Sequence, residues 1–123
     1  MGDFQKLEIW KEAHLLTIKI YKLTDKLPKS ELFVLTSQIR RAAISVESNI
    51  AEGEGRFGKA DRLKFFVDSR ASIKEVQTQL LLIKDLYSNI SKESLGVFER
   101  YDVLIRRLNS LISYRRTNDL RAN

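Results

Sequence analysis

Apolar residues recur at steps of three and four along almost the whole of this 123-residue chain. Side chains at such steps share one face of an α-helix, whereas a half-buried strand would alternate apolar and polar residues. The first run ends at Pro28, the only proline, which lacks an amide hydrogen and restricts the residue before it. Its apolar positions are Ile9, Ala13, Leu16, Ile20, Leu23 and Leu27. No segment shows strand alternation, so the spacing predicts an all-α protein.

Breaks in this pattern divide the chain into four amphipathic helices with short connections. Ser30 or Glu31 suits the start of the second helix, because a hydroxyl cap or an early acid favours the positive end of a helix. Gly53, Gly55 and Gly58 mark the clearest loop. The predicted helices run from about Leu7 to Lys26, from Ser30 or Glu31 to Gly53, from Lys59 to Tyr87 and from Lys92 to Arg115, before a frayed polar tail at 118–123. We therefore expect one domain, 1–123, folded as an antiparallel up-down-up-down four-helix bundle.

The second predicted helix has an unusual polar face. Where surface helices commonly carry Lys and Glu, residues 36–56 (TSQIRRAAISVESNIAEGEGR) carry Ser, Gln, Asn and paired Arg. Ser69, Ala71 and Ser72 are similarly small in the third helix, so a neighbouring helix can approach closely there. The pattern predicts close helix packing with specific hydrogen bonds, or a surface that touches a partner. We expect Glu52 to pair with a cation of the third helix, Arg70 or Lys74, rather than to act as a catalytic carboxylate.

The chain is basic, with 22 lysines and arginines against 16 acidic residues and a net charge of +6. Such a balance favours anionic partners, nucleic acid first. Three adjacent pairs of arginines are the candidate phosphate contacts, namely Arg40 and Arg41, Arg106 and Arg107, and Arg115 and Arg116. Adjacent residues on a helix point about 100° apart, so each pair spreads over two faces of its helix. The alternative to phosphate contact is that these arginines are ordinary solvated charges on the flanks of their helices. The local excess of positive charge favours the four C-terminal arginines, whereas the sequence motif favours Arg40 and Arg41. The sequence therefore does not decide which face binds.

Residues suited to catalysis or metal binding are scarce. The chain has no cysteine, and His14 is its only histidine. Lys11, three residues before His14, breaks the Glu-x-x-His pattern of di-metal carboxylate bundles. The stretch EGEGR at 52–56 lacks the spacing of a phosphate-binding G-x-G-x-x-G loop and has acids where phosphate would lie. We therefore expect no enzyme, no metal and no cofactor, with His14 at the boundary of the core.

The apolar stripes are wider than the core of one bundle needs. Trp10, Ile18 and Tyr21 widen the first stripe. Leftover apolar surface would meet another subunit, so we expect self-association. No apolar run approaches the roughly 20 residues of a membrane span, and the N-terminus lacks a basic region followed by an apolar run. The expectation is a cytoplasmic protein with no membrane partner.

Three segments resemble the four-helix-bundle protein family that includes proteins encoded in intervening sequences of bacterial 23S rRNA genes. They are FQKLEIWKEA at 4–13, LTSQIRRAAISVESNIAEGEGR at 35–56 and SIKEVQTQL at 72–80. The resemblance implies a left-handed antiparallel bundle, a ring-like homopentamer with a basic surface, and no established catalytic residue. Proteins related to this family include the accessory protein of diversity-generating retroelements, for which binding to nucleic acid and to a reverse transcriptase is inferred.

The motif positions that the resemblance carries over lie mainly in the second helix. They are Gln38, Arg40, Arg41, Ser45, Asn49, Glu52, Gly53, Gly55, Arg56 and Glu75. The chain departs from the family at Ala71 and Ser72, where a Gly-Ser pair is frequent, and at Phe57 and Gly58, where Ser or Thr often caps the third helix. These departures affect fine packing and leave the charged motif intact.

The sequence as a whole predicts a non-enzymatic, homo-oligomeric bundle that binds nucleic acid, RNA ahead of DNA, through arginines and lysines. The alternative is a protein-interaction scaffold whose positive charge is incidental. A protein partner that stays bound after nuclease treatment would distinguish the scaffold from the nucleic-acid-binding protein. An enzyme is the last choice, because no catalytic companion to His14 or Glu52 is found.

Overall fold

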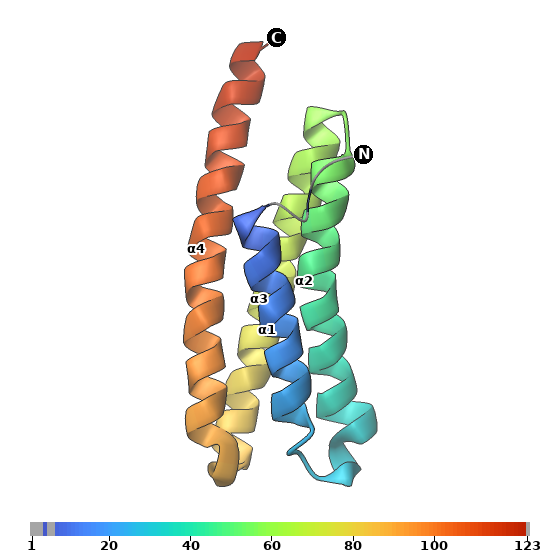
Figure 1. The fold of residues 1–123 in the computed structure, drawn as a ribbon, viewed down its shortest axis with the longest axis vertical. Coiled ribbons are helices and arrows are strands. Elements are labelled where there is room, and N and C mark those ends of the chain that lie inside the picture. Colours follow the sequence, from blue (N-terminus) through green and yellow to red (C-terminus); the bar gives the residue numbers. More distant parts are fainter. Residues whose placement is uncertain (1–3, 5–6, 123) are drawn as a thin grey trace.

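The protein is a bundle of four long helices that lie side by side, and the chain reverses direction at each connection (Figure 1). The computed structural model describes Phe4 and residues 7–122, with side chains described to residue 117. The long helices are α1 (Glu8–Thr24), α2 (Ser37–Gly55), α3 (Lys59–Leu86) and α4 (Ser91–Ala122). This described part contains no strand. The predicted all-α four-helix bundle is confirmed.

The core is formed by the stripes that the sequence predicts. All six apolar positions of the first run, from Ile9 to Leu27, are buried. Burial of such stripes supplies the main driving force for folding. Tyr101 of α4 is fully buried, and its hydroxyl has no hydrogen-bond partner among the described residues. Burial raises the pKa of Tyr101, so the phenol is neutral at physiological pH.

Helices α2 and α3 pack closely through small side chains. The Ser69 hydroxyl donates to the backbone carbonyl of Val46 at 2.8 Å, and the hydroxyls of Ser45 and Ser72 lie 2.9 Å apart. At Gly53, an added Cβ would come within 2.8 Å of the Phe66 ring. The close packing with hydrogen bonds that the small polar residues predict is confirmed.

The start of the second helix differs from the prediction. A 3₁₀ turn, η2 (Lys29–Glu31), and a π-helical turn, η3 (Leu32–Thr36), precede α2, and no side-chain cap forms at η2. The wide π turn places both Leu35 and Thr36 in the core, whereas Phe33 is 87% exposed. Packing in the core, and not a cap by Ser30, therefore sets the geometry of the segment that leads into α2.

Helix α4 is longer than predicted, because it continues to Ala122 instead of ending near Arg115. No glycine or proline follows Gly96, so nothing in the sequence stops a helix that is already formed. Figure 1 shows this end of α4 extending past the other helices. Gly96 lies in the second turn of this helix.

Replacing Gly53 tests the close contact between α2 and α3. We expect Gly53→Ala to lower the free energy of unfolding by about 1–3 kcal/mol, because the new methyl group would push against the Phe66 ring and the Arg62 carbonyl. Gly55→Ala is the matched control, since a Cβ there meets nothing within 4 Å. Urea unfolding followed by circular dichroism measures both variants, and equal stabilities would contradict the role of Gly53.

Candidate nucleic-acid interface

Arg40 is engaged inside the molecule, between α1 and α2. Its Nε donates to the Thr24 hydroxyl at 2.9 Å and its Nη2 to the Asp25 carboxylate at 3.0 Å. The guanidinium also lies 4.3 Å from the centre of the Tyr21 ring, a cation–π contact. These three contacts fix the end of α1 against α2, so little of this guanidinium is left to bind phosphate.

Arg115 is engaged in the same way, between α4 and the end of α2. Its Nη2 donates to the Glu54 carboxylate at 3.0 Å, and both side chains are only 21% exposed. The guanidinium lies 5.7 Å from the centre of the Phe66 ring. Arg115 therefore fastens the long α4 to the α2–α3 pair.

The other four arginines of the predicted pairs face solvent. Arg41 on α2 and Arg106, Arg107 and Arg116 on α4 are exposed and form no ion pair within the described part of the chain. Adjacent arginines thus have different surroundings, as the 100° step about a helix axis requires. Three of the four exposed arginines share α4.

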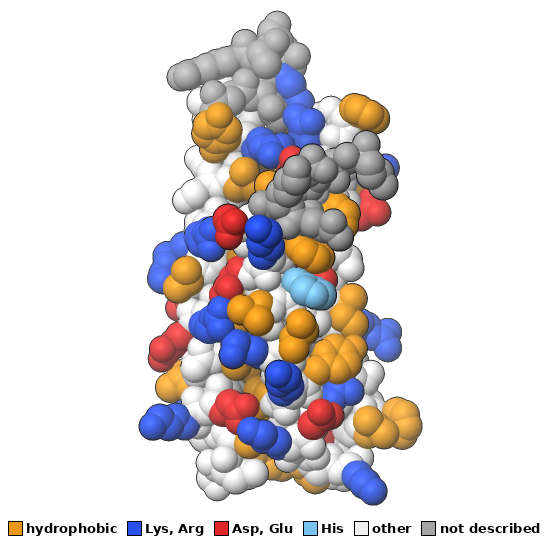
Figure 2. Space-filling view, viewed as in Figure 1, with side chains coloured by type: hydrophobic (Ala, Val, Ile, Leu, Met, Phe, Trp, Pro, Cys, Tyr) orange, Lys and Arg blue, Asp and Glu red, His pale blue; other side chains and the backbone are white. Residues whose placement is uncertain are grey.

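Lysines of α1 join α4 in a basic face that sequence reasoning missed. Lys and Arg side chains gather along the line where α1 and α4 meet (Figure 2). Lys19 and Lys22 of α1 have no ion pair among the described residues. Their spacing of three places them on one side of the helix, which is a signal available in the sequence, although only the fold shows that this side adjoins α4.

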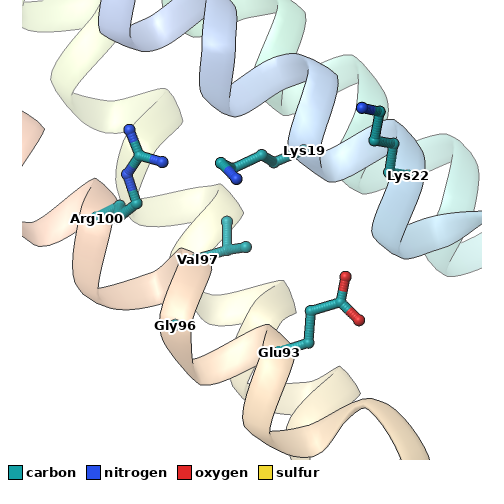
Figure 3. Close-up of a pocket in the computed structure, with 6 residues that line it drawn as sticks. All are labelled: Lys19, Lys22, Glu93, Gly96, Val97 and Arg100. Carbon is teal, nitrogen blue, oxygen red and sulfur yellow. The ribbon is translucent and has the colours of Figure 1, made fainter.

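Two ion pairs cross the line between α1 and α4. The Arg100 guanidinium donates to both carboxylate oxygens of Glu12, with a closest distance of 2.8 Å. Further along, Lys26 Nζ lies 2.7 Å from the Glu93 carboxylate. Between these pairs the helices leave a groove of about 320 Å³, here called the α1–α4 groove (Figure 3). It is lined by Lys19, Lys22, Glu93, Gly96, Val97 and Arg100.

A second groove, here called the α1–α2 groove, is lined by several aromatic and aliphatic side chains. Its volume is about 430 Å³. It is lined by Tyr21, Leu32, Phe33, Thr36, Ser37, Arg40, Arg41 and Ile44. Phe33 and Ile44 are exposed in the free chain, so this groove presents apolar surface to solvent.

The motif residues of α2 divide into packing and surface positions. Asn49 donates to the carbonyl and the hydroxyl of Ser45, at 2.9 and 3.0 Å. Glu52 pairs at 3.0 Å with Arg56, the residue that follows the last residue of α2. The predicted pairing of Glu52 with Arg70 or Lys74 is wrong, because Arg70 reaches across to Asn109 of α4 instead.

Gln38 and Glu75, the remaining motif positions with polar side chains, are exposed. Neither forms a hydrogen bond or an ion pair with its side chain in the described residues. Gly55 is also exposed, at the end of α2. These positions therefore contribute nothing visible to packing within one chain.

His14 lies on the surface of α1, outside the core boundary that the sequence suggested. It stacks on Trp10 with ring centres 4.9 Å apart and lies 2.9 Å from the Glu47 carboxylate. The described residues hold no group of three His, Cys, Asp or Glu side chains that could bind a metal ion. Among the helices described, none is long and apolar enough to cross a membrane.

Comparison with known proteins gives a family and a fold. Residues 5–110 match the family model described as 23S rRNA-intervening sequence protein. The chain is also similar to a solved structure from Bacteroides thetaiotaomicron, described as a protein with unknown function from the S23 ribosomal protein family. That match has a TM-score of 0.78 and 20% identity, and covers 85% of this chain and 95% of the other. No curated protein matches the chain.

Substitution of the two neighbouring arginines tests their different surroundings. We expect Arg40→Ala to lower the free energy of unfolding by about 1–2 kcal/mol, because it removes the hydrogen bond to Thr24 and the contact with the Tyr21 ring. Arg41→Ala, which removes the same charge from an exposed position, should change it by less than about 0.5 kcal/mol. Chemical unfolding compares the two variants, and a larger loss in Arg41→Ala would refute the assignment.

Proposed function

The chain belongs to the family of 23S rRNA-intervening sequence proteins, and from this premise we propose that it is a non-enzymatic, homo-oligomeric RNA-binding protein of the cytoplasm. One observation carries the proposal. Cations without ion-pair partners in the described residues gather on α1 and α4, where Lys22, Arg106 and Arg107 are exposed and Lys19 is half-buried. Such a surface attracts the phosphates of a nucleic acid without reading its bases.

The different contacts of the arginines support the α1–α4 surface, and not the pair Arg40 and Arg41, as the place where RNA binds. Arg40 and Arg115 hold helices together, so their charges are already compensated. Arg106 and Arg107 form no ion pair among the described residues, so they can neutralise phosphates and release the counterions of the nucleic acid, which is the source of electrostatic affinity. RNA is preferred over DNA because of the family to which the chain belongs.

RNA binding should weaken steeply as salt rises. With roughly four phosphate contacts on a single strand, the logarithm of the binding constant should fall with a slope of about −3 against the logarithm of salt concentration. Arg107→Gln should weaken binding about fivefold near 0.1 M salt, because it removes one contact. Lys74→Gln on α3, an exposed position with the same charge change, is the control.

Fluorescence anisotropy of a labelled single-stranded RNA measures these constants, with a DNA of the same sequence as competitor. Undetectable binding to RNA at low salt would refute the proposed function. Equal losses of RNA affinity in Arg107→Gln and Lys74→Gln would show that the binding surface is not on α4.

Self-association is the second part of the proposal, and the α1–α2 groove supports it. The groove places the exposed side chains of Phe33 and Ile44 beside Tyr21. Apolar patches of this kind, bordered by polar residues such as Arg41 and Ser37, are typical of protein interfaces. We propose a second copy of this chain as the occupant, with the homopentamer that the resemblance implies as the assembled form.

Phe33→Ser should dissociate this assembly. Burial of a phenylalanine at an interface contributes about 2 kcal/mol, so the substitution should weaken each contact by roughly thirtyfold. Phe57→Ser is the matched control, because Phe57 is 99% exposed in the α2–α3 turn, away from the groove. Light scattering coupled to size exclusion gives the masses. A wild-type monomer at all concentrations would exclude self-association and leave the groove to a different protein, which is the interaction-scaffold alternative.

A further inference from the structure

The α1–α4 groove holds an uncompensated positive charge. Its acid, Glu93, is paired with Lys26, and its arginine, Arg100, is paired with Glu12. Lys19 and Lys22 have no such partner in the described residues, so two positive charges remain over the groove. Figure 3 shows both lysines on the α1 side, with the Lys19 side chain extending toward Arg100 across the groove.

The floor of the groove is open because α4 has a glycine there. Gly96 lies in the second turn of α4, where a glycine destabilises a helix by about 0.5–1 kcal/mol relative to alanine. A Cβ at this position would meet nothing within 4 Å, so packing inside the chain does not require the glycine. What Gly96 provides is room beside Val97 for a group from outside the chain to approach the α4 backbone.

The chemistry of the donors indicates phosphate. A carboxylate is best bound by the two parallel donors of an arginine, but Arg100 already directs such a pair, Nε and Nη2, at the Glu12 carboxylate. The two lysines offer compact ammonium charges, each with three donors that can follow the oxygens of a phosphate. The volume of about 320 Å³ is at the small end of ligand pockets, about 300–1,000 Å³, so one nucleotide unit suits it better than a larger group.

We propose that the α1–α4 groove is a seat for one phosphodiester of a bound RNA strand. Lys19 and Lys22 contact its non-bridging oxygens, while the strand passes over Gly96 and Val97. The inference rests on the proposed RNA binding. It specifies where on the protein the strand is held most closely. Arg106 and Arg107, further along α4, would then contact neighbouring phosphates.

A substitution that fills the groove without changing any charge tests this inference. Gly96→Leu should weaken binding of a short labelled single-stranded RNA at least fivefold and make the salt slope shallower, because the strand loses its contact with the lysines. Lys22→Gln should weaken binding about fivefold and reduce the slope by about 0.7. The probe is read by fluorescence anisotropy at several salt concentrations.

Two controls separate the groove from general charge and from helix stability. Gly55→Leu makes the same exchange at a second helical glycine with open surroundings, far along the chain from the groove, and should bind RNA as the wild type does. Lys74→Gln removes one exposed charge from α3 and should weaken binding less than twofold. Circular dichroism confirms that each variant is folded.

The possible results separate failure of the proposed phosphate site from failure of the proposed RNA binding. RNA binding by the wild type with no loss in Gly96→Leu would overturn the groove and leave the proposed function standing. No RNA binding by the wild type would overturn both. A polyglutamate peptide whose binding is abolished by Gly96→Leu, while RNA binding is untouched, would assign the groove to an acidic protein segment and also overturn the proposal.

Discussion

The close contact of α2 with α3 is the constraint on which the rest of the bundle depends. The Ser69 hydroxyl bonds to the Val46 carbonyl, and Gly53 leaves just enough space for the Phe66 ring. Side chains of this size let two backbones approach, and they satisfy polar groups that would otherwise be buried alone. This rigid pair is the scaffold to which the other two helices are attached, α1 through Arg40 and α4 through Arg115.

The contact between α1 and α4 is of a different kind. Two ion pairs, Glu12 with Arg100 and Lys26 with Glu93, hold the helices near the two ends of the groove, and between them the surfaces separate. Long charged side chains keep helices further apart than serine and glycine do, which accounts for the groove between α1 and α4. Because Glu12 and Glu93 are used in these pairs, Lys19 and Lys22 are left without an ion-pair partner in the described part of the chain.

Most of the helices and the core could be predicted from the sequence, because the three- and four-residue spacing of apolar residues reports directly which side of a helix is buried. The candidate site could be predicted only in part. Arg40 and Arg41 look equivalent in the sequence, yet Arg40 contacts Thr24 and Arg41 faces solvent. Glu52 looked like a partner for the third helix, and it pairs instead with Arg56, just after the end of its own helix.

The sequence by itself determined that this protein is an all-α bundle with a basic surface, because periodicity, net charge and the absence of strand patterns are properties of the chain alone. The tertiary structure decided which charges are compensated and which are available, because an ion pair such as Glu12 with Arg100 joins residues that are far apart in the chain. It also decided that Gly96 faces a groove, since open space beside a helix exists only once its neighbours are in place. Local spacing fixes which face of a helix is polar, and only packing fixes what that face meets.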